Sequence, residues 1–494
     1  MTGQSSLFKG IFTLGVAQMI SLAGALVVTV LLPRYLGDVN LGKLAFAGAL
    51  TSLFGLIADL GTMTYLTKQI ARDPAQAGRL TLGTILTRIP LGVGAALLAV
   101  AVVHLTDDDP VTRSIVYVMS VAMILVSLGN TLGAALQGLH RMRALAVSMV
   151  VGKLAYAALV AWLLLSGFGP VEVALASLIS TFVGTGVAAV VLGRVLTRAP
   201  LPSGDTLRRV LFGGMPFFVW QASLIVYGQI DVVLLALMTS DAVVGWYAAA
   251  YRIIMIPAFF PTTVVTAALP ALSATAHEPA AFRSIAERCV RIVALTTIPM
   301  AFGILVIPDK LIDALGYPAI FQHSLVPIVL LALHMPLAGI DMVLGTMLTA
   351  LDRQRFWAMA GVAAAVLNPS FNLIAIPLTQ RLTGNGAIGA AAITTLTELF
   401  MFTVCLRLMP RGLLGWSTAA FGLKCVAASA LMAAIVWTFR DVPLVASVVI
   451  GFAAYAVLAI ALRVISVEEV RDLTTFVLRQ RGRGQAVAAE PPAL

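Results

Sequence analysis

The sequence predicts an all-α polytopic membrane protein of about fourteen transmembrane helices, arranged as two pseudo-symmetric six-helix lobes plus two C-terminal helices. Of the 494 residues, 60% are hydrophobic and only 11% are charged, so a water-soluble chain could not cover this apolar surface. Apolar segments of roughly 20 residues recur from end to end, each long enough to cross a hydrocarbon core about 30 Å thick. Basic residues gather in alternate connections between them.

The predicted helices follow these apolar runs, whose ends are marked by charged residues, glycine or proline. In order they cover residues 10–32, 41–66, 79–104, 113–136, 143–166, 170–194, 210–238, 242–270, 286–307, 321–350, 356–378, 387–408, 414–438 and 441–464. The N-terminal MTGQSSLFKG leads into a full-length span without a small-residue cleavage signature, which predicts a first transmembrane helix instead of a removable signal. The three cysteines lack metal-ligand spacing and are interpreted as packing residues.

The charge distribution predicts that both termini are cytoplasmic. With that orientation the inner connections hold basic residues, which are Lys68, Arg72, Arg79, Arg141, Arg143, Arg194, Arg198, Arg208, Arg209, Arg283, Arg288, Arg291, Arg353, Arg355, Arg407 and Arg411. The outer connections are short and poor in bases. Topology therefore explains the net charge of +10, and no nucleic-acid partner is expected.

Internal repeats predict the division into lobes. The stretch YLGDVNLGKLAFAGAL (35–50) aligns with LMTSDAVVGWYAAAYR (237–252), and residues 135–178 parallel residues 350–393 in the spacing from a basic turn to a glycine-bearing turn. The expected units are an N-lobe, a C-lobe, two further helices and a cytoplasmic tail, at residues 1–200, 201–410, 411–465 and 466–494. The tail begins as a short amphipathic helix.

Several segments together carry a resemblance to a known family. They read RYLGDVNLGKLAFA, FGLIADLGTMTYLTKQIAR, DVVLLALMTSDAVVGWYAAAYRI and LNPSFNLIAIPLTQRLTGNGAIGAAAITTLTELF. The chain resembles the polysaccharide-biosynthesis branch of the multidrug/oligosaccharidyl-lipid/polysaccharide exporter superfamily, which includes the Wzx-type oligosaccharide flippases. The resemblance implies a transporter in the bacterial cytoplasmic membrane that moves undecaprenyl-diphosphate-linked oligosaccharide to the outer leaflet by alternating access. Membrane lipids and other polysaccharide-assembly proteins are the further partners it implies.

The related lipid II flippases add a candidate substrate ligand. YAAAYRIIMIPAFFP is similar to their eighth helix, where a substrate-contacting arginine corresponds to Arg252. Their cationic positions in the first two helices have no basic match here, because those helices offer Gln18, Ser21 and Asp59. The final two helices resemble the pair that forms a lipid-tail groove in that family.

Eight charged residues lie in the interiors of the predicted helices, away from the helix ends: Arg88, Lys153, Arg252, Lys424, Asp59, Asp231, Asp341 and Glu398. At about 1.5 Å rise per residue, three acid–base pairs match in depth, namely Asp231 with Arg252, Asp59 with Arg88 and Glu398 with Lys424. One interpretation is that all three are structural ion pairs. The other, favoured for Arg252, is that its donor fork binds a diphosphate and that Asp231 holds it in the empty protein.

Four further candidates complete the predicted binding site. Lys153 and Asp341 lack a depth-matched partner, so Lys153 either extends to the membrane surface or contacts a sugar phosphate or uronate. Trp220 and Tyr227 lie deep enough to stack on sugar rings.

Two alternative functions stay open, a cation-coupled multidrug antiporter and a membrane glycosyltransferase or polymerase. No nucleotide loop, metal cluster or nucleophile with a base is found, so neither an enzyme nor a cofactor is expected.

Overall fold

The computed structural model describes residues 2–107, 109–410 and 412–464, and these residues form helices and no strand. Twelve of the described helices are long and apolar enough to cross a membrane, and the bent pair α8 and α9 adds a thirteenth span. The expectation of an all-α membrane protein is confirmed. The predicted cytoplasmic tail lies outside the described residues.

The helices in chain order follow most of the predicted ranges closely. They are α1 (Thr2–Asp59), α2 (Thr62–Arg72), η1 (Pro74–Gln76), α3 (Ala77–Thr106), α4 (Pro110–Gly138), α5 (Met142–Leu165), α6 (Pro170–Thr197), α7 (Gly204–Met238), α8 (Asp241–Met255), α9 (Phe259–Ala274), α10 (Pro279–Val306), α11 (Pro308–Ala314), η2 (Ala319–Ser324), α12 (Leu325–Ala350), α13 (Gln354–Thr383), α14 (Gly386–Leu408), α15 (Trp416–Thr438) and α16 (Leu444–Ala461).

The first helix, α1, contains two transmembrane segments. Inside its 58 residues Gly37 adopts φ 73° and ψ −178°, a conformation open to glycine and strained for other residues. The chain turns back at this residue. Because the two segments are continuous in α1, twelve or thirteen spanning helices correspond to the approximately fourteen crossings that the sequence predicts.

Two predicted helices are interrupted in the structure. The helix expected over 242–270 divides into α8 and α9, which are bent by 48° at Pro257, because proline removes a helical hydrogen bond and clashes with the preceding turn. The helix expected over 41–66 ends at Asp59, since Leu60 and Gly61 have φ of 43° and 68°. A Cβ atom on Gly61 would lie 2.4 Å from the carbonyl oxygen of Gly214, so this break lets α7 approach closely.

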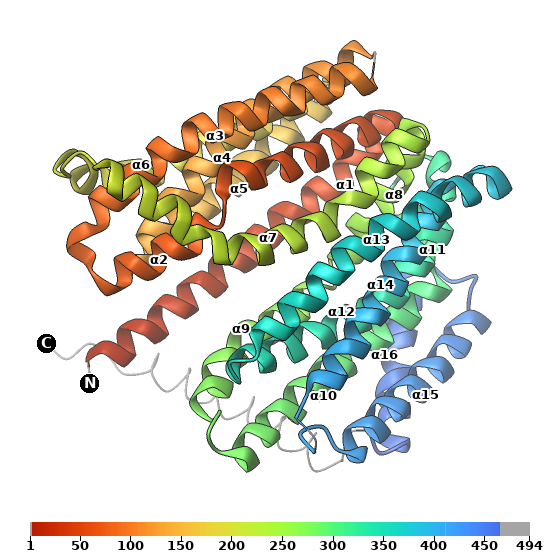
Figure 1. Ribbon diagram of the computed structural model, residues 1–494. Coiled ribbons are helices and arrows are strands. Elements are labelled where there is room, and N and C mark those ends of the chain that lie inside the picture. The colour runs from red at the N-terminus through yellow and green to blue at the C-terminus, as the bar shows by residue number, and fades with distance from the viewer. Residues whose placement is uncertain (1, 108, 411, 465–494) are drawn as a thin grey trace, which may run out of the picture.

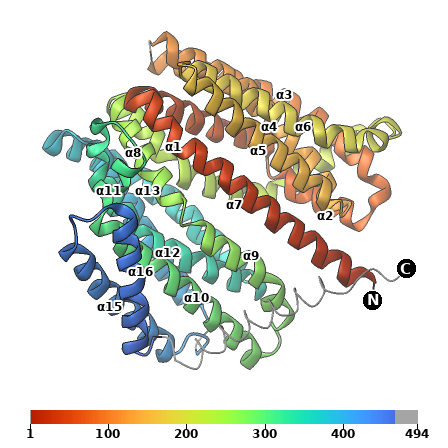
Figure 2. The ribbon, with the colours of Figure 1, turned by 180° about the vertical axis from the view of Figure 1, so that it is seen from behind.

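The packing separates the helices into two groups and a peripheral pair. We call α1–α6 the N-lobe and α7–α14 the C-lobe; α15 packs along α10, with α16 against α15 (Figures 1 and 2). Helix α7 belongs to both groups, because it packs against α13 and also against α1, α2 and α3. The domain boundaries and the pseudo-symmetry of the lobes stay predictions.

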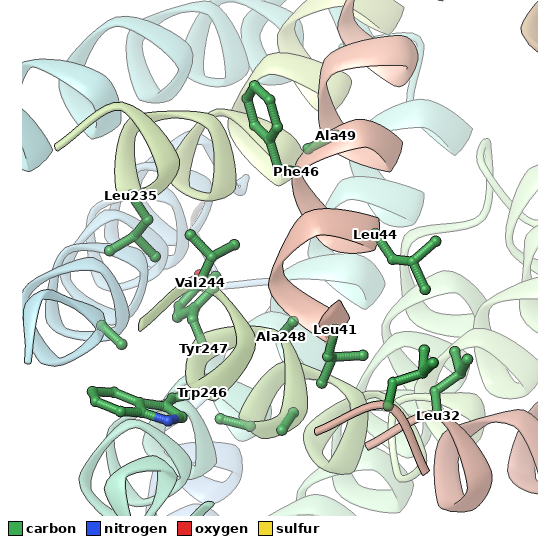
Figure 3. Packing of buried hydrophobic residues seen from close by; sticks show 14 of the residues in the cluster. Leu32, Leu41, Leu44, Phe46, Ala49, Leu235, Val244, Trp246, Tyr247 and Ala248 are labelled. Carbon is green, nitrogen blue, oxygen red and sulfur yellow. The ribbon is translucent and has the colours of Figure 1, made fainter. Parts of the chain in front are cut away.

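The two lobes meet most closely where the turn of α1 contacts α8. We call this end of the bundle the outer end, in the orientation that the basic connections predict. A Cβ atom on Gly42 would lie 1.9 Å from the carbonyl oxygen of Asp241, and one on Gly245 would lie 2.0 Å from that of Asp38. Glycine at both positions therefore lets the two backbones touch. Around them the buried side chains of α1 and α8 form one apolar cluster (Figure 3).

Polar contacts close the same end. Trp246 donates from its indole Nε1 to Asp38 Oδ2 over 3.0 Å and stacks on the His323 ring, with centroids 4.3 Å apart. Ser324 donates to the Trp246 carbonyl oxygen, and the Tyr317 hydroxyl donates to the Thr29 carbonyl oxygen over 2.7 Å. The segment between α10 and α12 thus ties the C-lobe to α1.

An ion pair joins α1 to the N-terminus of α4. Lys43 Nζ lies 2.7 Å from Asp109 Oδ2, which also accepts from the backbone amide and the hydroxyl of Thr112. Burial by itself would raise the pKa of Asp109, but the bonds from Lys43 and Thr112 outweigh it and hold this pKa below its ordinary value. The contact therefore stabilises the fold at neutral pH and is lost only as the pH falls through that lowered pKa.

The orientation of the bundle is tested by cysteine labelling. We expect Thr106→Cys, at the exposed end of α3, to react with a membrane-impermeant maleimide added outside intact cells. Gln354→Cys, at the start of α13, is expected to react only after the cells are opened. The native Cys289, Cys405 and Cys425 are buried, so the background is low. The reverse pattern would contradict the predicted topology.

The glycine contact between the lobes gives a second prediction. Gly42→Ala should destabilise the protein by about 1–3 kcal/mol, because the added methyl group overlaps backbone atoms that cannot rotate away. Gly228→Ala on α7 is the matched control, since a Cβ atom there meets nothing within 4 Å. The free energy of unfolding of the purified variants measures both effects. Equal values for the two variants would show that the lobes do not depend on this contact.

Candidate functional site

Arg252 lies in the last turn of α8, before the break at Pro257, where the C-lobe faces the N-lobe. Its half-buried side chain makes no hydrogen bond or ion pair to any residue that the structure describes. Its guanidinium is within electrostatic range of the hydroxyl groups of Tyr156 on α5 and of Tyr317. A permanent charge is thus held between the lobes at membrane depth without a counter-ion from the described part of the chain.

The predicted pairing of Asp231 with Arg252 is wrong. The Asp231 carboxylate is buried and accepts hydrogen bonds from the Tyr247 hydroxyl (3.0 Å), Asn372 Nδ2 (2.8 Å) and Thr394 Oγ1 (2.5 Å). The Tyr247 hydroxyl contacts Asp231, whereas Arg252 lies five residues further along α8, about 7.5 Å along the helix axis and about 140° around it.

Asp231 on α7 lies beside Asn368 and Asn372 on α13 and Thr394 on α14. We call these four residues the oxygen-donor cluster, because their side-chain oxygens are potential ligands of a cation. Asn372 Nδ2 donates to Asn368 Oδ1 over 3.0 Å, which leaves Asn372 Oδ1 and Asn368 Nδ2 buried without partners. No described cationic side chain pairs with Asp231. A carboxylate, amide oxygens and a hydroxyl are the ligands that hard cations prefer, so this cluster can hold a proton or a small cation.

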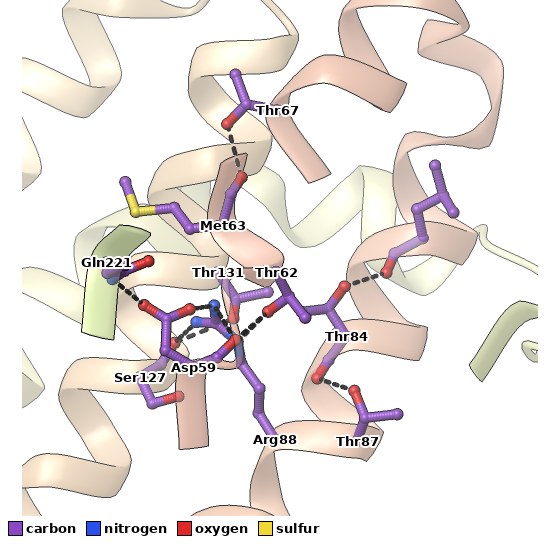
Figure 4. Close-up of polar contacts among 11 residues, drawn as sticks. Asp59, Thr62, Met63, Thr67, Thr84, Thr87, Arg88, Ser127, Thr131 and Gln221 are labelled. Atoms are coloured by element: carbon purple, nitrogen blue, oxygen red, sulfur yellow. Dashed lines mark hydrogen bonds and ion pairs between the residues drawn. The ribbon is translucent and has the colours of Figure 1, made fainter. Parts of the chain in front are cut away.

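The predicted pair of Asp59 and Arg88 is confirmed. Arg88 donates to the Asp59 carboxylate, to Thr62 Oγ1 over 2.9 Å and to the Ser127 carbonyl oxygen over 2.7 Å, and it is 1% exposed (Figure 4). Gln221 of α7 donates to the other carboxylate oxygen of Asp59 over 2.8 Å. The pair is fully engaged within the protein, so we assign Asp59 a structural role and no contact with a ligand.

The predicted pair of Glu398 and Lys424 is wrong. Glu398 accepts from the Tyr227 hydroxyl over 2.7 Å and lies 3.9 Å from His334 Nδ1, whereas Lys424 is exposed on α15. The reason is that α15 packs on α10 instead of on α14, its neighbour in the chain. Asp341 is buried near Glu398, faces the Cys405 thiol, and its Oδ1 has no hydrogen-bond partner. This acidic group is separate from Arg252.

The remaining candidates occupy different surroundings. Lys153 is exposed on α5 and lines a cavity inside the N-lobe together with Tyr156. Trp220 packs against Trp357, with ring centroids 4.3 Å apart, so α13 covers part of its ring. Of the predicted site residues, Lys153 is therefore the one that the structure connects to Arg252, through Tyr156, which lines this cavity and faces the guanidinium.

Comparison with known proteins identifies the family. Residues 7–276, more than half of the chain, match the model of the family described as "Polysaccharide biosynthesis protein". The chain belongs to this family. The chain is 24% identical over 366 residues to the "Probable low-salt glycan biosynthesis flippase Agl15" of Haloferax volcanii, covering 74% of this chain and 75% of that protein.

Solved structures share the fold of this family member. "Lipid II flippase MurJ, inward closed conformation" matches with a TM-score of 0.75 at 14% identity, covering 91% of this chain and 98% of that one. An inward-facing multidrug resistance MATE family transporter of the MOP superfamily matches with a TM-score of 0.62 at 17% identity, over 79% and 94%. At these identities the likeness shows the fold alone, and it confirms the predicted superfamily architecture.

The sequence analysis did not predict the uncharged polar residues near Asp231 and Arg252. Asn368 and Asn372 are four residues apart in an otherwise apolar segment, a spacing that places two amides on one helix face. That signal could have been used. Tyr156 and Tyr317 carried no comparable signal, because isolated tyrosines in membrane helices are commonly interfacial.

The Asp59–Arg88 pair generates a stability prediction for this family member. Arg88→Met leaves a buried carboxylate without its counter-ion, so we expect a loss of about 3–5 kcal/mol in the free energy of unfolding. Adding Asp59→Asn should recover most of that loss. Arg355→Met, at an exposed position of α13, is the control and should change little. A loss no greater than that of the control would show that the pair is dispensable.

Proposed function

We propose that this protein is a flippase that moves undecaprenyl-diphosphate-linked oligosaccharide across the cytoplasmic membrane by alternating access, for the biosynthesis of a surface polysaccharide. One observation carries the proposal: Arg252 presents its guanidinium between the two lobes, at membrane depth, with no ion-pair partner among the described residues. A planar fork of donors suits a diphosphate, whose charge would replace the missing protein counter-ion. The family match and the flippase relative support this assignment.

The lobe arrangement also suits alternating access. The outer contact between α1 and α8 combines a close backbone approach at glycines, polar contacts and one apolar cluster, while Asp59 and Gln221 join the N-lobe to α7 nearer the inner end. Arg252 lies between these two contacts. A ligand on its guanidinium would therefore touch the surface along which the lobes separate.

A second candidate function is a cation-coupled antiporter. The oxygen-donor cluster around Asp231 favours it, because a buried carboxylate without a cationic partner can exchange a proton or a small cation. The same cluster can also supply the driving force for a flippase. The flippase carries a lipid-linked diphosphate, whereas the antiporter carries a drug. The effect of Arg252 substitutions on polysaccharide export therefore distinguishes the two functions.

Export of polysaccharide tests the proposed function. In cells that lack their own flippase, we expect Arg252→Ala to lower export at least tenfold at equal protein level, since a charge-assisted contact contributes about 1.5–3 kcal/mol. Arg252→Lys should retain part of the export, because lysine keeps the charge but loses the fork. Arg355→Ala, outside the membrane-embedded part of α13, is the control.

Two results would contradict the flippase proposal. One is normal polysaccharide export by Arg252→Ala. The other is recovery of export when Asp231→Ala is added to Arg252→Ala, which would make the arginine a structural partner of that acid. The structure predicts no such recovery, because Asp231 is bound to Tyr247, Asn372 and Thr394 instead.

A further inference from the structure

The N-lobe contains a cavity of about 480 Å³ between α4, α5 and α6. This volume falls within the range of small-molecule sites, about 300–1,000 Å³. The cavity spans the middle of the lobe and extends toward its inner end, because its lining runs from Leu145 to Tyr156 on α5 and from Ser177 to Ala188 on α6. Tyr156 is also within electrostatic range of Arg252, so this end of the cavity lies toward the surface where the two lobes meet.

The wall of this cavity has hydrogen-bonding capacity that the protein does not use. Asn130 and Thr181 line it and make no hydrogen bond to a described residue. Ser148 and Ser180 donate their hydroxyl protons to carbonyl oxygens of their own helices, Leu145 and Ser177, which leaves their lone pairs free to accept. Methyl and methylene groups fill the rest of the wall. This mixture suits a sugar ring, which has apolar faces and hydroxyl edges.

The charge of the cavity is positive. Lys153 is the one charged residue of its lining. Among the described residues of α4, α5 and α6 the only carboxylate is Glu172, which lies twelve residues, or about 18 Å, along α6 from Gly184 and accepts from the backbone amide of Gly169. Lys153 makes no ion pair within the described part of the chain.

The depth of Lys153 makes an unpaired charge costly. It lies eleven residues from the first residue of α5, Met142, or about 16 Å along the helix. A lysine at this depth of a membrane is unfavourable unless water, a counter-ion or a bound anion solvates its charge. A hydrated cavity that takes an anion removes that cost in the loaded state.

The space itself depends on glycine. A Cβ atom on Gly184 would lie 3.1 Å from the Ser148 carbonyl oxygen, and one on Gly129 would lie 2.6 Å from Thr185 Oγ1. Helices α5 and α6 therefore cross closely at Gly152 and Gly184 and leave the opening between α4 and α5.

We propose that this N-lobe cavity is a subsite for an acidic sugar, a uronate or a sugar phosphate, whose anionic group pairs with Lys153. The inference rests on the proposed function, because it extends the site from the diphosphate at Arg252 to the sugars attached to it. It assigns the protein a preference among lipid-linked oligosaccharides. Chains with an acidic residue close to the diphosphate are bound better than neutral chains of the same length.

Soluble sugars test the subsite without the lipid carrier. Purified protein in nanodiscs of zwitterionic lipid is titrated calorimetrically with trigalacturonate, as the acidic probe, and with maltotriose, as the neutral probe. We expect trigalacturonate to bind at least tenfold more tightly than maltotriose. Lys153→Gln should abolish this difference and leave maltotriose unchanged, and Lys153→Arg should keep most of it.

A control variant distinguishes binding at Lys153 from a non-specific attraction of the acidic sugar to the positive charge of the whole protein. Lys68→Gln removes an exposed lysine of α2 outside the cavity and should change neither affinity. The proposal is overturned if wild-type protein binds neither sugar or binds both equally. It is also overturned if Lys153→Gln keeps the preference, or if Lys68→Gln removes it to the same extent.

Failure of this subsite is distinguishable from failure of the flippase function. Arg252→Ala should retain trigalacturonate binding within about threefold, because the probe carries no diphosphate and Lys153 supplies its counter-charge. If polysaccharide export depends on Arg252 while sugar binding ignores Lys153, the flippase stands and the acidic-sugar subsite is wrong. If Lys153 selects the acidic sugar while export ignores Arg252, the subsite stands and the diphosphate assignment is wrong.

Discussion

Hydrocarbon solvates neither backbone amides nor charged side chains, and the architecture of this protein follows from that constraint. The described chain satisfies its backbone almost entirely within helices. It leaves helical geometry at positions such as Gly37, Gly61 and Pro257, where a turn, a close helix contact or a bend requires it. The same constraint gives every intramembrane charge a definable environment: a salt bridge, a hydrogen-bonded cluster, a cavity or the lipid-facing surface.

Glycine sets how closely the lobes approach each other. Gly42 and Gly245 bring α1 and α8 into backbone contact at the outer end, and Gly61 does the same for α7 nearer the inner end. At the outer end the buried side chains of α1 and α8 surround this backbone contact, so separating the lobes there exposes apolar surface. In the proposed alternating access, the free energy of opening the outer end has to offset that exposure. Helix α7 is placed to transmit such movement, since it packs against both of them.

The intramembrane charges divide by whether the protein itself neutralises them. Asp59 and Arg88 neutralise each other, and Gln221 ties them to α7. Asp231 has hydrogen-bond donors but no positive partner, whereas Arg252 and Lys153 have no partner among the described residues. Uncompensated cations at the lobe surface and in the N-lobe cavity are what an anionic cargo requires. The uncompensated acid on the C-lobe side is what a coupling cation requires.

The sequence by itself determined the fold class, most helix boundaries and which charged residues lie inside the helices. Each of these follows from a local property, namely hydropathy over about 20 residues. Tertiary structure alone decided which charges meet. Asp231 contacts Tyr247 and not Arg252, because the direction of a side chain around a helix depends on which neighbours the helix packs against. Glu398 and Lys424 lie on consecutive helices that do not pack together, and Asp59 and Arg88 lie on two that do. The cavity beside Lys153 likewise arises from the crossing of α5 and α6 at Gly152 and Gly184, a contact between segments that no local pattern encodes.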